Sequence, residues 1–314
     1  MTRVPDPSAT GAELASLLTE VRRIEVQSSK LVTEIMAGGY SSVFRGSGIE
    51  FREVREYVDG DDPRAVDWNV TARVGRPFVK EYVEERERTL LFLLDLSAST
   101  GGGFGIWSAR QMAARVCACL ALSAVKNDDK VGLVAFGARV EKFVPPRKGL
   151  RHVLRVVRDG LALPETAGRS ALTPALEFAA RALRRRAIVF CVSDFLADDW
   201  RHAATLCARR HDLIAVRLAP PELTPPFTAL AAAGPMRVRD PETGASTLVD
   251  WSSQVVRDAY AARVLDWRAR TVADLRRAQI DLMDVPVPRV YDRDAVARPI
   301  LQFFRMRELR GEKR

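Results

Sequence analysis

The feature that most constrains the fold is a set of short apolar runs that alternate with helical stretches along the chain. Residues 90–94 read Leu-Leu-Phe-Leu-Leu, and residues 130–136 and 188–192 are of the same kind. A strand that is apolar at every position is buried on both faces, as in a parallel sheet covered by helices. The alternation of such strands with helical segments therefore predicts an α/β fold with a doubly wound, mostly parallel sheet.

The same pattern divides the chain into three expected parts. Residues 1–88 are expected to hold an N-terminal helix and a small α+β extension, residues 89–285 the sheet domain, and residues 286–314 a C-terminal helical tail. Apolar residues at helical spacing over residues 13–36 predict the first helix. Trp267 falls on a long amphipathic stretch near the end of the sheet domain, where we expect it in the core.

Composition limits the function classes. The net charge is +9 over 314 residues, but arginine supplies most of the basic residues and lies beside Glu and Asp along the helices, so no nucleic-acid partner is expected. Four cysteines do not make a disulfide framework in a chain of this length. The longest apolar stretch is about half of what a spanning helix needs, and no signal peptide opens the chain. We therefore expect a cytoplasmic protein without a transmembrane segment.

Oxygen-bearing side chains follow two of the predicted strands directly. Asp95, Ser97 and Ser99 come after the first apolar run, and Asp194 comes after a later one. In a doubly wound sheet, ligands bind at the carboxyl ends of central strands. Carboxylates and hydroxyls gathered there suit a hard divalent cation, Mg²⁺ or Mn²⁺.

These residues resemble the Asp-x-Ser-x-Ser signature of von Willebrand factor type A domains, and Asp194 matches the downstream aspartate of that family. The resemblance implies a metal-ion-dependent adhesion site, in which Mg²⁺ keeps a position open for an acidic residue of a partner protein. The family pattern also has a threonine before a helix. In this chain Ser170 stands at that position, and Thr173 is the alternate ligand.

The stretch before the sheet domain narrows the resemblance. Residues 57–73, residues 80–81 and residues 84–87 look like the bacterial family of domain of unknown function 58. The resemblance covers roughly residues 46–250. It implies a non-enzymatic adaptor that works with a MoxR-type AAA+ ATPase, or its client protein, in assembly or maturation.

An enzymatic alternative would use the same carboxylates in a metal-dependent hydrolase or phosphatase. Against this alternative, no histidine is near the predicted site in the sequence, and no nucleophile–base pair can be assembled. The glycine-rich segment at residues 101–105 also fails the dinucleotide-binding spacing, because Ile106 stands where the third glycine belongs. The alternative for Asp95, Ser97 and Ser99 is a helix N-cap without metal.

A second acidic group precedes the sheet domain. Asp61, Asp62 and Asp67 could form a partner surface, or Asp61 and Asp62 could simply cap a short helix that begins at Pro63 and runs to about Arg73. In the second interpretation, Trp68 anchors the N-terminal extension against the sheet domain.

Overall fold

The computed structural model describes Thr19 and residues 49–84, 87–164, 166, 170–227, 234–292 and 294–311. Apart from Thr19, the helix predicted over residues 13–36 lies outside the described residues.

A six-stranded sheet forms the centre of the protein, in the order β10-β7-β6-β3-β4-β5. Its strands are β3 (Thr89–Asp95), β4 (Lys130–Phe136), β5 (Val140–Arg147), β6 (Ile188–Ser193), β7 (Asp212–Ala219) and β10 (Asp281–Pro286). Neighbouring strands are parallel except at the edge, where β5 runs antiparallel to β4. The doubly wound, mostly parallel sheet predicted from the apolar runs is confirmed, and β3 and β6 lie side by side within it.

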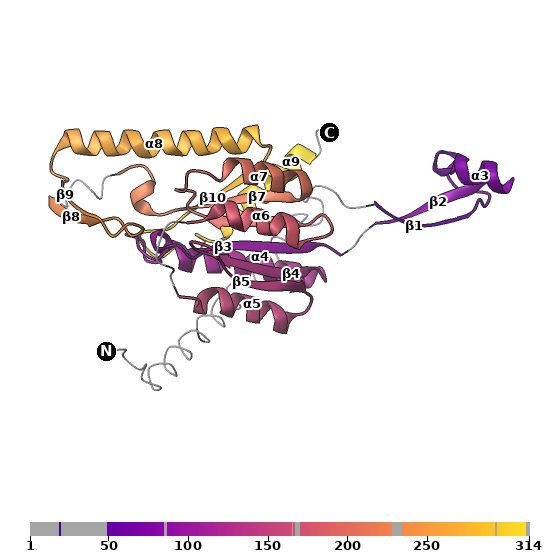
Figure 1. The fold of residues 1–314 in the computed structure, drawn as a ribbon, viewed down its shortest axis with the longest axis horizontal. Helices are drawn as coiled ribbons and strands as arrows, with labels where there is room; N and C mark the ends of the chain where they lie inside the picture. Colours follow the sequence, from indigo (N-terminus) through magenta and orange to yellow (C-terminus); the bar gives the residue numbers. More distant parts are fainter. Residues whose placement is uncertain are drawn as a thin grey trace.

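Helices cover both faces of this sheet (Figure 1). One face carries α4 (Ala109–Lys126), α5 (Leu150–Ala162) and α9 (Ala297–Gly311), and the other carries α6 (Leu172–Ala182), α7 (Arg201–Arg210) and α8 (Gln254–Arg277). Alternate residues of β3 supply the two cores: Leu90, Phe92 and Leu94 pack on the first face, and Leu91 and Leu93 on the second. None of the described helices is long and apolar enough to cross a bilayer.

A hairpin and a long helix are inserted between β7 and β10. After the 3-10 helix η3 (Pro221–Leu223), the hairpin consists of β8 (Pro235–Arg239) and β9 (Ser246–Asp250), and α8 follows it. Residues 240–244 form the turn between these strands, where the Asp240 carboxylate accepts from the backbone N–H of Glu242 at 2.9 Å. Gly244 has φ of +73°, a backbone conformation that favours glycine.

The N-terminal extension is a β-hairpin, β1 (Ile49–Glu56) and β2 (Phe78–Glu84), that projects beyond the end of the sheet opposite β8 and β9 (Figure 1). Between its strands lie the 3-10 helix η1 (Pro63–Ala65) and α3 (Trp68–Val74) rather than one continuous helix. The break falls at Val66, which forms a bridge to Val79 of β2. The expected anchoring role of Trp68 is wrong: it is the first residue of α3, and 72% of its surface is exposed.

The C-terminal helix α9 is a layer of the domain rather than a projecting tail. Ile300 and Phe303 are buried in the same core as β3 and α4. Arg307, also buried, bonds both oxygens of Asp212 at 2.8 and 3.0 Å and pairs with Asp281 at 2.9 Å. These contacts join α9 to the first residues of β7 and β10.

Candidate metal centre

The predicted site residues meet at the carboxyl ends of β3 and β6. Asp95 is the last residue of β3, and Ser97 and Ser99 occupy the loop and 3-10 helix η2 (Ala98–Thr100) that follow. Asp194 comes directly after β6, and Ser170 lies just before α6. Because β3 and β6 are adjacent, residues about 100 positions apart in the chain come within hydrogen-bond distance.

One carboxylate oxygen of Asp95 accepts hydrogen bonds from two serine hydroxyls. Ser170 Oγ and Ser193 Oγ each donate to Asp95 Oδ2 at 2.6 Å. The second oxygen, Oδ1, accepts the backbone N–H of Ser97 at 2.9 Å. The alternate ligand Thr173 points elsewhere, because its hydroxyl donates to the carbonyl of Asp199 at 2.7 Å. Of the two candidates, Ser170 is therefore the one that contacts Asp95.

Asp194, the second carboxylate, accepts a hydrogen bond from another serine of the site. Ser99 Oγ donates to Asp194 Oδ2 at 2.7 Å, and Ser97 Oγ lies 3.1 Å from Ser99 Oγ. The backbone N–H of Leu196 donates to Asp194 Oδ1 at 3.0 Å. All five predicted ligands therefore belong to one network, in which Ser97 connects the two carboxylates through its backbone N–H to Asp95 and its hydroxyl to Ser99.

Ser193 belongs to this network, and the sequence did not single it out as a ligand. It is the last residue of β6, and its side chain is fully buried. The available signal in the sequence was a hydroxyl side chain at the carboxyl end of an otherwise apolar strand, where it does not contribute to the apolar core. Its contact with Asp95 depends on the pairing of β6 with β3, which periodicity does not reveal.

The N-cap interpretation does not account for these serines. Ser97 precedes η2, but its hydroxyl makes no capping hydrogen bond to that helix. It faces Ser99 Oγ instead. The hydroxyls are thus turned toward the carboxylates and away from the helix backbone.

Electrostatics make the carboxylate pair costly without a cation. Asp95 is 1% exposed and Asp194 is 3% exposed. Burial, and next the nearby charge of Asp95, raise the pKa of Asp194 to about 7. Two buried carboxylates surrounded by neutral hydroxyl oxygens match the ligand preference of Mg²⁺ and Mn²⁺, so the residues present fit such an ion. Among the described residues, no group of three or more His, Cys, Asp or Glu side chains is placed to hold a metal, and this site has two carboxylates with serine hydroxyls instead.

A groove opens beside the site. Its volume is about 370 Å³, and its lining includes the site residue Ser170. Four acidic residues line it from two elements: Asp198 and Asp199 after β6, and Asp240 and Glu242 at the tip of the β8–β9 hairpin. The negative charge of Glu242 also contributes to raising the pKa of Asp194. The groove thus extends the site with a negatively charged wall.

The glycine-rich segment lies on the loop that follows the metal-site serines. The backbone N–H of Phe104 donates to Glu222 Oε2 at 3.2 Å. A Cβ at Gly103 would lie 3.1 Å from Glu222 Oε1, and its φ is +125°. A phosphate-binding loop needs backbone N–H groups that are free to bind the phosphate. Here the carboxylate of Glu222, from η3, accepts one of these N–H groups instead.

The acidic residues of the extension have local partners. Asp61 forms a two-point ion pair with Arg55, with both distances at 2.7 Å, and this pair lowers the pKa of Asp61 to about 2. Asp62 accepts from the backbone of Arg64 and caps η1, and Asp67 caps α3. The capping prediction is confirmed for Asp62, whereas Asp67 caps a second helix that the sequence pattern did not separate from the first. The use of these acidic residues as a partner surface stays a prediction.

Fold and site together define a class of protein. A doubly wound sheet with one antiparallel edge strand, and with Asp-x-Ser-x-Ser at the end of a central strand, is a von Willebrand factor type A-like architecture. More particularly, the family model described as "Protein of unknown function DUF58" matches residues 53–270. The chain belongs to this family.

Similar proteins are known from several organisms. The uncharacterized proteins Rv1480 of Mycobacterium tuberculosis and Mb1516 of Mycobacterium bovis are each 28% identical over 285 residues, which cover 89% of this chain and 88% of theirs. An aerotolerance-related membrane protein from Bacteroides fragilis is 15% identical over 70% of this chain and 99% of its own, with a TM-score of 0.44. Proximal thread matrix protein 1 of the mussel byssus, with a zinc-occupied MIDAS motif, is 17% identical over 42% of this chain and 38% of its own, with a TM-score of 0.33.

Proposed function

We propose that this protein is a non-enzymatic adaptor that binds a partner protein through a divalent cation, Mg²⁺ or Mn²⁺, held at the ends of β3 and β6. One observation carries the proposal: two buried carboxylates, Asp95 and Asp194, each accept hydrogen bonds from serine hydroxyls of the same site. A bound cation would neutralise the two charges and accept the hydroxyl oxygens as ligands.

The donor set explains how the site would select an acidic partner residue. Asp95 and Asp194 supply two negative charges, which balance one divalent cation. Ser97, Ser99 and Ser170 supply neutral oxygens that add no further charge. A cation held this way retains attraction for one more anionic ligand, such as the side chain of a partner Asp or Glu.

The acidic groove adds a second requirement, on the charge of the partner segment. Asp198, Asp199, Asp240 and Glu242 would repel an acidic segment and favour a basic one beside the cation. We therefore expect the partner segment to combine one acidic residue with neighbouring Lys or Arg. From the family resemblance, the partner is a MoxR-type AAA+ ATPase or its client protein, met in the cytoplasm during assembly or maturation.

Metal binding by the full chain is the first test. Titration calorimetry with Mg²⁺ and with Mn²⁺ would compare the wild type with Asp95→Asn and with the matched control Asp198→Asn. Both variants remove one carboxylate charge, but only Asp95 contacts the site serines, whereas Asp198 is exposed in the groove. We expect Asp95→Asn to lose cation binding and Asp198→Asn to retain it.

Partner binding is the second test. The tagged chain would be mixed with the purified MoxR-type ATPase of the same organism, in Mg²⁺ and in EDTA. We expect capture by the wild type only in Mg²⁺, and no capture by Asp95→Asn. Capture that ignores both EDTA and Asp95→Asn would refute a metal-dependent adaptor.

A further inference from the structure

The loop that carries Asp194 is held by a side chain from the inserted helix α8. Trp267 Nε1 donates to the carbonyl oxygen of Phe195 at 3.1 Å. Phe195 directly follows Asp194, and its φ is +60°, in the left-handed region. A phenylalanine reaches this conformation only where the surroundings impose it. Burial of its ring, whose centroid lies 5.3 Å from that of Trp200 in an edge contact, and the bond from Trp267 are two of its restraints.

Hydrogen bonds connect this restrained loop to the metal site. The N–H of Phe195 donates to Ser193 Oγ at 3.1 Å, and Ser193 Oγ in turn donates to Asp95 Oδ2 at 2.6 Å. A chain of hydrogen bonds thus runs from Trp267 through Phe195 and Ser193 to Asp95. Displacing Trp267 would loosen the residue that follows Asp194 and the hydroxyl that orients Asp95.

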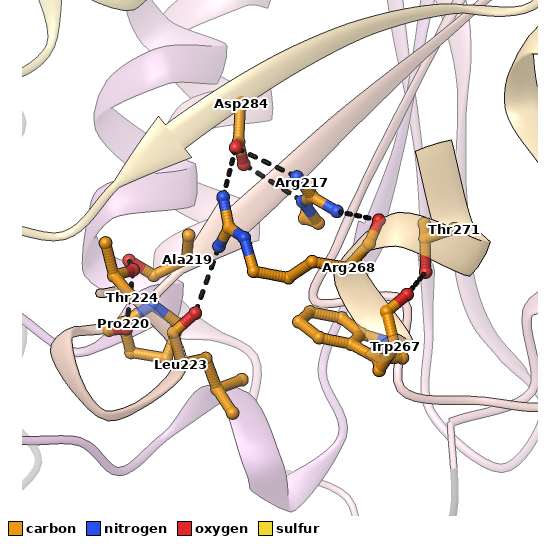
Figure 2. Close-up of polar contacts among 9 residues, drawn as sticks. All are labelled: Arg217, Ala219, Pro220, Leu223, Thr224, Trp267, Arg268, Thr271 and Asp284. Atoms are coloured by element: carbon orange, nitrogen blue, oxygen red, sulfur yellow. Dashed lines mark hydrogen bonds and ion pairs between the residues drawn. The ribbon is translucent and has the colours of Figure 1, made fainter. Parts of the chain in front are cut away.

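Trp267 itself is fixed by a charged network between α8 and the sheet, shown in Figure 2. Arg217 of β7 pairs in register with Ser193 and is 2% exposed at its side chain. Its guanidinium bonds both oxygens of Asp284 at 2.9 and 3.0 Å and lies 5.6 Å from the centre of the Trp267 ring. Arg268, the next residue of α8, also bonds Asp284, so α8 is tied to β7 and β10 beside the metal loop.

From these contacts we propose that Trp267 is a positioning residue for the metal site: through the Phe195 carbonyl it holds the loop that bears Asp194, and α8 thereby sets the affinity for the cation. The inference rests on the proposed function, because it concerns the same site. It assigns to the β7–β10 insertion a role in metal affinity beyond covering one face of the sheet.

The chain offers a matched pair of variants. Trp267→Phe removes the indole N–H and keeps an aromatic ring over Arg217. Trp251→Phe removes an indole N–H that makes no hydrogen bond within the described residues, at a residue that is 6% exposed. Both substitutions shorten a tryptophan in the same way, but only the first breaks the bond to the metal loop.

We expect Trp267→Phe to weaken Mg²⁺ and Mn²⁺ binding about fivefold, the factor for one hydrogen bond of ordinary net strength. Trp251→Phe should leave the affinity unchanged. Titration calorimetry on the full chain measures both. As a second readout, Mg²⁺ should shift the indole ¹H–¹⁵N resonance of Trp267 and leave that of Trp251 in place, each resonance being assigned by its loss in the corresponding variant.

The outcomes separate the two proposals. If the wild type binds Mg²⁺ or Mn²⁺ but Trp267→Phe binds it as tightly as Trp251→Phe does, the positioning role is refuted and the proposed function stands. An indole resonance of Trp267 that stays fixed up to saturation with Mg²⁺ would refute it in the same way. A wild-type chain that binds neither cation would overturn the proposed function and, with it, this inference.

Discussion

Replacing Asp194 by Asn removes one charge from the carboxylate pair while keeping the shape of the side chain. The Asn carbonyl can still accept the N–H of Leu196, which now lies 3.0 Å from Asp194 Oδ1. The Ser99 hydroxyl, now a donor to Oδ2 at 2.7 Å, can accept from the Asn amide instead. The substitution therefore isolates the electrostatic cost of the second carboxylate.

The pKa of Asp194 gives the size of that cost. Burial and Asp95 raise this pKa from 3.8 to about 7 in the folded protein. Between these two values the unfolded chain has released the proton and the folded chain retains it, so the stability of the metal-free protein falls as pH rises. A shift of about three units corresponds to about 4 kcal/mol of unfolding free energy, lost between about pH 4 and pH 7.

Urea unfolding, followed by circular dichroism in EDTA at about pH 4 and about pH 8, measures this loss for the wild type and for Asp194→Asn. Because asparagine does not titrate, the variant should lack the part of the loss that belongs to Asp194. It should therefore be the more stable protein at the higher pH. Mg²⁺ at 100 times its dissociation constant should return about 2.7 kcal/mol to the wild type and little to the variant.

Two results would refute this reasoning. One is a pH dependence of stability that is the same in Asp194→Asn and in the wild type. The other is a variant that is less stable than the wild type in EDTA at about pH 8, since the second carboxylate would then not carry the electrostatic cost assigned to it.

Three further predictions follow from the contacts described above. Ser170→Ala should weaken Mg²⁺ binding about tenfold, and Thr173→Ala should leave it unchanged, as measured by titration calorimetry; equal affinities in the two variants would contradict the assignment. Trp68→Ser should change the free energy of unfolding by less than about 0.5 kcal/mol because this side chain is exposed, and a larger loss in urea would restore its anchoring role. Arg307→Met should cost about 3–5 kcal/mol in the same assay, because it removes the cation paired with the buried carboxylate of Asp212; a neutral effect would show that this pair does not hold α9.

The sequence by itself determined the layered sheet and most of the candidate site. A strand such as Leu90–Leu94, apolar at every position, has few stable environments other than the interior of a covered parallel sheet. The motif at Asp95, Ser97 and Ser99 is local, and its position after that strand fixes the edge at which its oxygens gather. These features depend on residues close together in the chain, which is why periodicity and spacing reveal them.

Only the tertiary structure decided which residues from distant parts of the chain contact this local motif. It brought Ser193 to Asp95, turned Thr173 toward Asp199 and left Trp68 exposed. The pattern of α8 predicted Trp267 in the core, but the structure leaves it half-buried, and only the packing of that helix against Arg217 of β7 joined its indole to the loop after Asp194. The physical reason is that periodicity states which face of an element is apolar, whereas the partner across that face depends on contacts between segments far apart in the chain.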